Sequence, residues 1–544
     1  MLAKLCTRSA VRRCAGTGVL ALALLGSVLP VPAAAAFAPV AAERPDLSRF
    51  YRQKVAWGAC AGPGMPRDMQ CGKVTVPLDY ARPGTGTLDL ALARYRGTGT
   101  GTSHHSVLLN FGGPGGAGVN ELAYDGKQFM ELTNGYDVVT FDPRGVGRSS
   151  PVSCGDGGDQ AAAVTGADAD LAHPQALLRQ LRQSAAACAR SSGDVLPYIG
   201  TVNAARDLDV VRQALGERKL NYLGFSYGTR LGSVYAAQFP HNVGRMALDG
   251  VDTLTESLAE QGIDGARGQQ TALEDFLDWC ARDTGCPFGR DRRAAGDAVA
   301  GLVRSLDRRP VTTDGGDPFS GQDLVAAIVQ ALYSKDLWPS LERALGSLTE
   351  DRDPRGIMGF ATGGAGPVLG RAAPGHDGLV DPQDVPADNL QAALLAINCA
   401  DDPDRPSAAR IAGDLKRLRA AYDEASPVFG RYRLTQVLMC YGRPKGTDFI
   451  RTRVKDVDTP RMLLVGTRGD PATPYPWAVS TAQRLGPAAV VLDNKGDGHT
   501  GYGSSVCVHR TVDDFLLHGS LPAYGSSCPA DGKEWSVFPN RIDR

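Results

Sequence analysis

Apolar and polar residues alternate in two segments near the start of the chain, residues 73–80 and 88–96. Alternation with a period of two is typical of a β-strand with one buried face. A turn containing Pro and Gly separates the two segments. The pattern therefore predicts a pair of antiparallel strands.

Further along, short apolar runs alternate with segments of helical periodicity. Alternation of this kind predicts an α/β fold, in which a mostly parallel sheet carries helices on both faces. The predicted strands are residues 106–111, 136–141, 220–223 and 245–248, and the predicted helices are 204–215 and the segment from the Ser226 turn to about residue 238.

The pattern changes from about residue 251 to 455, a segment rich in Gly, Pro and Asp with few β-branched runs. Helical periodicity dominates there, for example at 273–279, 324–333 and 390–397. Sheet signals return at 461–465 and 488–492, and 512–517 is expected to form a closing helix. We therefore predict a core built from residues 39–250 and 456–544, interrupted by a large inserted helical cap at 251–455.

Residues 1–38 have the features of an export signal peptide. Four basic residues precede a mostly apolar stretch from Val19 to Val31, and small residues follow, with Ala36 and Ala38 as candidate ends of an A-x-A cleavage site. A buried N-terminal helix is the alternative, which these flanking residues disfavour. The adjacent Arg12 and Arg13 are weak evidence for twin-arginine export.

The rest of the chain contains no apolar stretch long enough to span a bilayer. No cysteine lies at the cleavage region, so no lipid anchor is expected. The formal net charge of −1 becomes −5 once residues 1–38 and their four basic side chains are removed. We therefore expect a secreted monomer with no membrane anchor and no nucleic-acid partner.

Ten of the twelve cysteines lie beyond residue 38. An even number of cysteines in an exported chain favours disulfides, and the lack of a CxxC motif or a Cys/His cluster argues against a metal site. The sequence alone does not fix the connectivity. Because each consecutive pair closes a modest loop, we expect Cys60–Cys71, Cys154–Cys188, Cys280–Cys286, Cys399–Cys440 and Cys507–Cys528.

The segment Gly224-Phe225-Ser226-Tyr227-Gly228 matches the G-x-S-x-G pattern of a nucleophile elbow. In such an elbow the serine occupies a tight turn between a strand and a helix, where side chains at the glycine positions would collide. The predicted strand before Ser226 and the predicted helix after it supply this context. An ordinary glycine-rich turn is the alternative, and catalytic partners decide between the two.

Candidate partners follow Ser226 in the order that the elbow requires, an acid and then a histidine. Asp470 comes after the predicted strand at 461–465, and His499 comes after the predicted strand at 488–492. Both are thus expected at the C-terminal edge of the sheet, where ligand sites of open α/β sheets form. We predict that His499 exchanges a proton with Ser226 and that Asp470 orients His499.

Other acids and histidines fit these roles less well. Asp493 and Asp497 lie too close to His499 in sequence to occupy a separate loop. The remaining histidines are expected to be solvated surface residues: His104, His105, His173, His241, His376, His509 and His518.

An acyl-transfer site also needs N–H donors for the oxyanion. The backbone N–H of Tyr227 is one expected donor, and a second is expected from the Gly112–Gly116 loop, with Gly113 as the preferred residue. No Gly-Lys-Ser/Thr follows this glycine run, so a nucleotide-binding loop is not expected.

Four segments carry a family resemblance when taken together: Asn110–Gly118, Phe141–Gly147, the elbow Gly224–Gly228 and Asp470–Tyr475. In combination they resemble the secreted tripeptidyl aminopeptidases of actinomycetes, which are relatives of the prolyl aminopeptidases. The similarity extends from Trp57 to Cys528. It implies an α/β-hydrolase core with a helical cap and cleavage of short peptides from a free N-terminus. It does not imply a metal or other cofactor, and we expect none.

An exopeptidase of this kind needs an anion that binds the ammonium group of the substrate. Within the predicted cap, Cys399-Ala400-Asp401 resembles a Cys-x-Asp element of the family, and our hypothesis is that Asp401 is this anion. A solvated aspartate at a helix end, beside Asp402 and Asp404, is the alternative. Thr473 is expected to support Asp470 or His499 by a hydrogen bond.

Three functions fit these features to different degrees. The leading expectation is a secreted serine exopeptidase that releases short peptides, tripeptides in particular, from peptide substrates. An extracellular carboxylesterase or lipase would use the same triad, because acyl-transfer chemistry does not distinguish amides from esters. A non-catalytic binding protein is disfavoured by the complete set of candidate catalytic residues.

Overall fold

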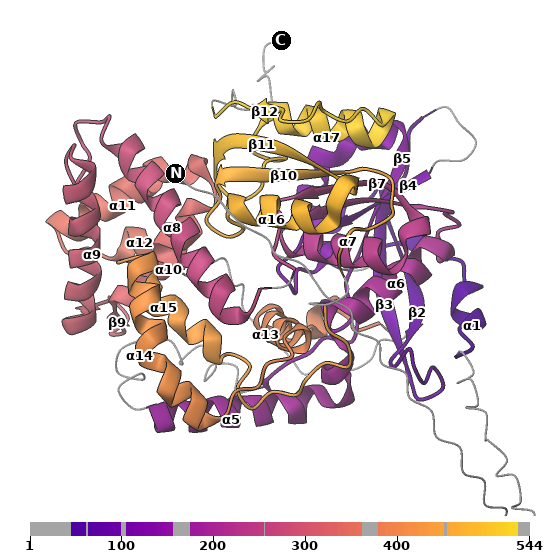
Figure 1. Ribbon diagram of the computed structural model, residues 1–544, viewed down its shortest axis with the longest axis horizontal. Helices are drawn as coiled ribbons and strands as arrows, with labels where there is room; N and C mark the ends of the chain where they lie inside the picture. The colour runs from indigo at the N-terminus through magenta and orange to yellow at the C-terminus, as the bar shows by residue number, and fades with distance from the viewer. Residues whose placement is uncertain are drawn as a thin grey trace, which may run out of the picture. The chain divides into compact units, whose positions relative to one another are not determined.

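Figure 1 shows the computed structural model of the chain, which describes residues 45–530 apart from 61, 63, 100–104, 156–173, 255, 362–378 and 451–453. The predicted signal peptide at 1–38 lies outside the described residues, as do His104, His173 and His376. Within the described part, no helix has the length and apolar character needed to cross a membrane.

A twisted, mostly parallel sheet forms the centre of the fold. The two segments with alternating polarity pair in antiparallel register as β2 and β3, and β3 pairs in the same sense with β5. From β5 onward all neighbouring strands are parallel. The ten strands of this sheet, as far as the chain is described, follow the order β1-β2-β3-β5-β4-β6-β7-β10-β11-β12. Their bounds are Gly58–Ala59, Met69–Pro77, Thr87–Tyr95, Tyr136–Phe141, His105–Asn110, Leu220–Phe225, Val243–Asp249, Met462–Gly469, Ala489–Asp497 and Ser527–Cys528 in that order.

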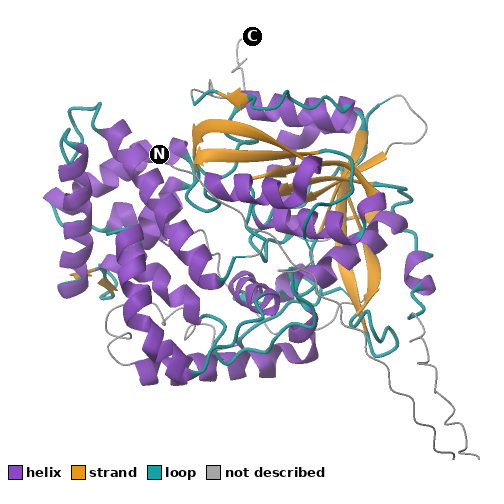
Figure 2. Cartoon of the chain, in the orientation of Figure 1, coloured by secondary structure: helices purple, strands orange, loops and turns teal. Residues whose placement is uncertain are grey.

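Helices cover both faces of this sheet, as Figure 2 shows. The apolar runs of the central strands are buried on both sides, which explains why they read as continuous hydrophobic segments. Helices α6 (Thr201–Ala214), α7 (Tyr227–Gln238) and α16 (Tyr475–Leu485) pack on one face, and α2 (Gly118–Asp125) and α17 (Val506–His518) pack on the other. The expected α/β architecture is confirmed.

The segment between β7 and β10 is helical, and we call residues 251–455 the cap. Ser257 and Ser320 begin two of its helices with reciprocal capping boxes, which satisfy the N–H groups of the first turn. A separate apolar cluster stabilises the cap from inside. Its helices are α8 (Leu258–Cys280), α9 (Arg292–Arg308), α10 (Gly321–Leu332), α11 (Trp338–Glu350), α12 (Arg355–Ala361), α13 (Asn389–Asp401), α14 (Ala408–Ala425) and α15 (Gly430–Arg433), with a short hairpin of β8 (Val311–Thr312) and β9 (Pro318–Phe319).

The predicted boundaries of the cap fall in the loops that leave β7 and enter β10. Helix α5 (Pro174–Ser192) belongs to the segment predicted as core, yet its apolar face packs against α14 of the cap. Figure 1 shows α5 running next to α14. The described residues of the core and the cap form one compact unit, so the division at 250 and 455 stays a prediction.

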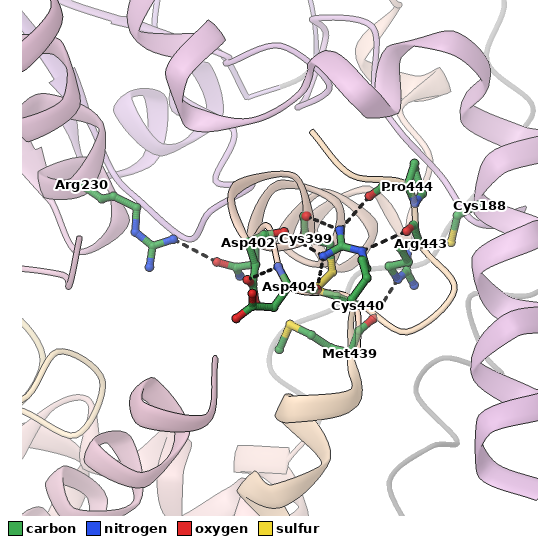
Figure 3. Close-up of a disulfide and its surroundings, with 11 residues drawn as sticks. Cys188, Arg230, Cys399, Asp402, Asp404, Met439, Cys440, Arg443 and Pro444 are labelled. Carbon is green, nitrogen blue, oxygen red and sulfur yellow. Dashed lines mark hydrogen bonds between the residues drawn. A yellow bond between two sulfur atoms is a disulfide. The ribbon is translucent and has the colours of Figure 1, made fainter. Parts of the chain in front are cut away.

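All five disulfides connect the cysteines in the predicted order: Cys60–Cys71, Cys154–Cys188, Cys280–Cys286, Cys399–Cys440 and Cys507–Cys528. The fourth of these joins the C-terminal end of α13 to the segment after α15, as Figure 3 shows. It therefore fixes the end of α13 that carries Asp401.

Candidate active site

Ser226 occupies the turn between β6 and α7. Its backbone has φ 54° and ψ −125°, a conformation that non-glycine residues rarely adopt and that costs free energy. The N–H of Ser226 donates a hydrogen bond to the carbonyl oxygen of Asp249, at 2.9 Å, which ties the turn to the neighbouring strand β7. The turn is therefore a strained but well-supported elbow, as predicted.

The two glycines of the elbow are required by close backbone approaches. A Cβ at Gly224 would lie 2.6 Å from the carbonyl oxygen of Gly228, and a Cβ at Gly228 would lie 2.6 Å from the carbonyl oxygen of Asn110. Because both obstacles are backbone atoms, a larger residue at either position would force the elbow to move.

Asp470 and His499 are brought together from two different loops. Strand β10 continues to Gly469 and β11 to Asp497, so each residue follows its strand within two positions. His499 Nδ1 lies 3.0 Å from both carboxylate oxygens of Asp470. Both face the same edge of the sheet as Ser226, which ends the parallel strand β6.

The Asp470 carboxylate is fully buried and accepts several hydrogen bonds. Oδ1 accepts from the N–H groups of Ala472 and Thr473, and Oδ2 accepts from the Thr473 hydroxyl at 2.8 Å and from the N–H of Thr500. The Thr473 hydroxyl also lies 3.5 Å from His499 Nδ1. These donors orient the carboxylate, and Thr473 supports it as expected.

The pKa values of this pair are shifted in opposite directions. Burial raises the pKa of Asp470, but the His499 ring and the donated hydrogen bonds outweigh it and hold the pKa below its ordinary value. Burial lowers the pKa of His499, but the Asp470 charge and hydrogen bond outweigh it and hold that pKa above its ordinary value. The pair thus favours a charged imidazolium beside a carboxylate, which is the form a general base passes through during acyl transfer.

Asp249 is a second carboxylate near His499, and sequence reasoning missed it. It ends β7 and accepts hydrogen bonds from the N–H groups of Gly501 and Tyr502, which follow His499. Burial raises its own pKa to about 6, and its charge contributes to the raised pKa of His499. The sequence did contain a signal for this residue, because Asp249 directly follows the predicted strand at 245–248.

The cap also contacts His499, through Tyr333 at the end of α10. The two rings lie 5.0 Å apart between centroids, edge to face. The Tyr333 carbonyl oxygen accepts the N–H of His499 at 2.9 Å. Tyr333 keeps 38% of its surface exposed, so it is open to solvent on the side that His499 does not cover.

The Gly112–Gly116 loop lies against the elbow. A Cβ at Gly112 would lie 2.5 Å from the carbonyl oxygen of Phe225 and 3.2 Å from the backbone nitrogen of Tyr227. Gly112 has φ +90° and the exposed Gly113 has φ +106°, values that favour glycine. Tyr227 is the first residue of α7, where N–H groups have no acceptor within the helix. The two predicted oxyanion donors therefore come from adjacent segments.

Asp401 is the last residue of α13 and is buried, not solvated. Oδ1 accepts the N–H of Thr201 at 2.7 Å, and Oδ2 accepts its hydroxyl at 2.5 Å. The Thr201 hydroxyl lies 2.6 Å from the Tyr227 hydroxyl, so one side chain separates Asp401 from the residue after Ser226. The Arg230 guanidinium lies 3.7 Å from Asp401 and 3.0 Å from Asp252.

The rival acids and histidines are placed as follows. Asp493 and Asp497 lie within β11, where they pair with Arg468 and Lys335 instead of His499. Among the described histidines, His105 pairs with Glu217, and His241 and His518 are exposed, as expected. The prediction for His509 was wrong, because it is buried under Tyr502 and faces Asp513, one turn along α17.

Two groups in the described part of the chain have the composition of a metal site. One consists of Glu342 and the disulfide-bonded Cys280 and Cys286, whose sulfurs are already bonded to each other. The other consists of Glu131, His509 and Asp513, in which His509 Nε2 lies 3.3 Å from Asp513 Oδ2. Neither group includes Ser226, Asp470 or His499.

Comparison with known proteins agrees with this geometry. A family profile described as "alpha/beta hydrolase fold" matches residues 106–361, and one described as "TAP-like protein" matches residues 426–528. The chain is 31% identical to serine protease Hip1 of Mycobacterium tuberculosis, over 88% of this chain and 91% of that protein. It is 30% identical to the tripeptidyl aminopeptidase of Streptomyces coelicolor, over 88% of this chain and 87% of that protein. It is 31% identical to a carboxylesterase B of M. tuberculosis, over 95% of this chain and 98% of that protein.

Proposed function

Because this chain belongs to the α/β-hydrolase family of serine hydrolases that includes Hip1 and the tripeptidyl aminopeptidases, we propose that it releases tripeptides from free N-termini with Ser226 as nucleophile. Its membership makes it a serine hydrolase and supports a serine exopeptidase; the tripeptide product and the catalytic residues are the proposal. The observation that carries the assignment of residues is the His499–Asp470 contact at 3.0 Å, at the sheet edge where β6 presents Ser226.

In the proposed mechanism, Ser226 Oγ attacks the carbonyl carbon of the third residue of the substrate. His499 accepts the Ser226 proton, and Asp470 stabilises the imidazolium that forms. The N–H groups of Tyr227 and Gly113 donate hydrogen bonds to the oxyanion. His499 then gives the proton to the leaving amine, and water hydrolyses the acyl-enzyme by the same steps in reverse order.

We place the substrate ammonium group at the C-terminal end of α13. A small cavity there is lined by three carboxylates, Glu256, Asp401 and Asp402, and by one cation, Arg230. The negative end of the α13 dipole adds to this acidic field. The local charge favours an ammonium ion, and Asp401 is connected to the elbow through Thr201 and Tyr227.

Secretion is part of the proposal. Five disulfides are unusual in a reducing compartment and typical of exported proteins. Together with the signal-like residues 1–38, they support an extracellular enzyme that acts on peptides.

The test is product analysis on peptides with free and acetylated N-termini. We expect mass spectrometry to find tripeptides from the free peptides and almost no product from the acetylated ones. The matched control is Ser226→Ala, which should lose both product formation and labelling by a fluorophosphonate. Dipeptide products, or labelling that persists in Ser226→Ala, would contradict the proposal.

A carboxylesterase is the second candidate function, because a relative of that name covers nearly the whole chain. The same triad would hydrolyse an ester without an ammonium anchor. Turnover of simple acyl esters that exceeds turnover of every free tripeptidyl substrate would favour this alternative.

A further inference from the structure

Arg433 is a cation in the cap whose polar contacts to described residues are all to neutral groups. It is the last residue of α15 and is partly buried. Its Nε donates to the side-chain oxygen of Gln269 at 2.8 Å, and its Nη1 donates to that of Gln436 at 3.1 Å. In the part of the chain that the structure describes, no carboxylate pairs with Arg433.

This arrangement is costly unless an anion completes it. A desolvated guanidinium loses the hydration of its charge, and amide oxygens replace only part of it. Burial lowers the pKa of Arg433, and only the hydroxyls of Tyr333 and Tyr422 act in the other direction. Most other buried arginines of the fold have carboxylate partners, as Arg144 has Asp207 and Arg212 has Asp209.

The position of Arg433 relates it to His499. Its guanidinium lies against the backbone of α8 at Gly265, and Gly268, one turn further along α8, packs on Pro474 and on the carbonyl oxygen of Asp470. The charges of both Arg433 and Asp470 influence Tyr333, whose ring packs on His499. Arg433 therefore belongs to the part of the cap around Tyr333, the residue that contacts His499.

The leaving part of a substrate must lie beside His499, because His499 has to reach the leaving amine to protonate it. The cap residues around Tyr333 are therefore candidates to border the residues after the cleaved bond, whereas α13, another part of the cap, carries the proposed ammonium site. Arg433, in this part of the cap, is a planar cation able to hold a carboxylate in two parallel hydrogen bonds.

We propose that Arg433 binds a carboxylate on the leaving part of the substrate, which makes short peptides with a free C-terminus the preferred substrates. This inference rests on the proposed peptidase function and deepens it. Together, Arg433 and the acidic end of α13 would present opposite charges to the two ends of a short peptide. An aspartate or glutamate side chain in the leaving part offers the same chemistry as a C-terminal carboxylate.

The test compares kcat/KM for matched tetrapeptides with free N-termini in the wild type and in Arg433→Gln. One pair differs only in a C-terminal acid or amide. A second pair consists of amides with Asp or Asn as the leaving residue. We expect the wild type to prefer the carboxylate member of at least one pair by on the order of tenfold or more, and Arg433→Gln to reduce that ratio to near one. Arg433→Lys keeps the charge without the planar geometry and should give an intermediate ratio.

Arg443→Gln is the matched control, because Arg443 is another partly buried arginine of the cap with neutral partners, the Met439 carbonyl oxygen and the Cys188 sulfur (Figure 3). Its ratios should equal those of the wild type. Each ratio compares two substrates on one preparation, so a reduced folded fraction cancels. If Arg433→Gln does not fold, Arg433→Lys decides in its place, and ratios equal to those of the wild type in that variant would overturn the proposal.

The outcomes separate the two proposals. If Arg433→Gln no longer prefers the carboxylate substrate of the first pair, Arg433 binds the C-terminal carboxylate. If it no longer prefers the carboxylate substrate of the second pair, Arg433 binds an acidic side chain. Equal wild-type rates within both pairs, or unchanged ratios in Arg433→Gln, would overturn the role of Arg433 while tripeptide release still supported the peptidase. No tripeptide from any substrate, with Ser226 labelled normally, would instead overturn the proposed function.

Discussion

The carbonyl oxygen of Tyr333 accepts the backbone N–H of His499 at 2.9 Å, and the Tyr333 ring packs edge to face on the imidazole. Tyr333 follows α10, whose residues belong to the cap, whereas His499 follows the core strand β11. The proposed general base is thus held by Asp470 from the core and by Tyr333 from the cap. Movement of the cap relative to the core would disturb the base directly.

Replacing Tyr333 should therefore impair catalysis without removing any triad residue. An edge-to-face aromatic pair contributes about 0.5–1.5 kcal/mol beyond its buried area, so we expect Tyr333→Ala to lower kcat/KM by roughly two- to tenfold. Tyr333→Phe keeps the ring and should lose less. Steady-state kinetics on one tripeptidyl substrate checks both variants. An Ala variant as active as the wild type would show that the Tyr333 ring does not help to orient His499.

The pH dependence of kcat/KM should report the raised pKa of His499. The base must be neutral to accept the Ser226 proton, so activity falls as the pH decreases through the His499 pKa. Because the Asp470 charge raises this pKa above its ordinary value, the acidic limb of the profile should lie above about 6.5.

Asp249→Asn should move this limb to lower pH. Asp249, with a pKa raised to about 6, is ionised over the range in which His499 titrates, and its charge stabilises the imidazolium. Removing that charge lowers the His499 pKa, so the variant should retain activity at more acidic pH than the wild type. Asp493→Asn, which removes a carboxylate paired with Arg468 on the surface, is the control and should leave the limb in place. A limb that stays fixed in Asp249→Asn would mean that Asp249 acts only as a support for the loop.

Much of the fold could be predicted, because its signals are local. The strand from 220 to 225 and the helix after Ser226 are set by short-range periodicity, and the steric demand for Gly224 and Gly228 is visible in the motif itself. The order rule for acid and histidine located Asp470 and His499, since that rule reflects chain topology.

The features that escaped prediction depend on tertiary packing. Tyr333 reaches His499 only because the cap folds over the sheet edge, and nothing in its sequence neighbourhood marks this contact. Helix α5 has an ordinary amphipathic pattern, and only the structure shows that its partner is α14. His509 was expected on the surface, like the other histidines outside the candidate triad, because it lies near the predicted closing helix, yet the Tyr502 ring covers it.

Gly112→Ala should damage the active site through a backbone collision. The new Cβ would lie 2.5 Å from the carbonyl oxygen of Phe225, and φ +90° is unfavourable for alanine. We expect a cost of about 1–3 kcal/mol in the free energy of unfolding and a large loss of kcat/KM, because the strain falls on the elbow. Gly296→Ala in α9 is the matched control, since it meets no atom within 4 Å and should stabilise the protein by about 0.5–1 kcal/mol. Denaturant unfolding and kinetics on both variants give the comparison.

Asp401→Asn tests whether the acidic end of α13 binds the substrate ammonium. Loss of one charge from a desolvated ion pair typically costs about 2–5 kcal/mol, so kcat/KM for free tripeptidyl substrates should fall at least about 30-fold. Hydrolysis of a small acyl ester, which has no ammonium group, should fall much less. The comparison of the two substrates matters because Asp401 also accepts two hydrogen bonds from Thr201, at the start of α6.

If those hydrogen bonds were the whole role of Asp401, its replacement would disturb Tyr227 through Thr201 and lower both activities together. Thr201→Val provides the matched variant, because it removes the hydroxyl link to Tyr227 and keeps the Asp401 charge. A selective loss on free-amine substrates in Asp401→Asn, with an unselective loss in Thr201→Val, identifies the anchor. Parallel losses in both variants would assign Asp401 to the support of α6 and the elbow, and would leave Glu256 or Asp402 of the same cavity as the residue that binds the ammonium.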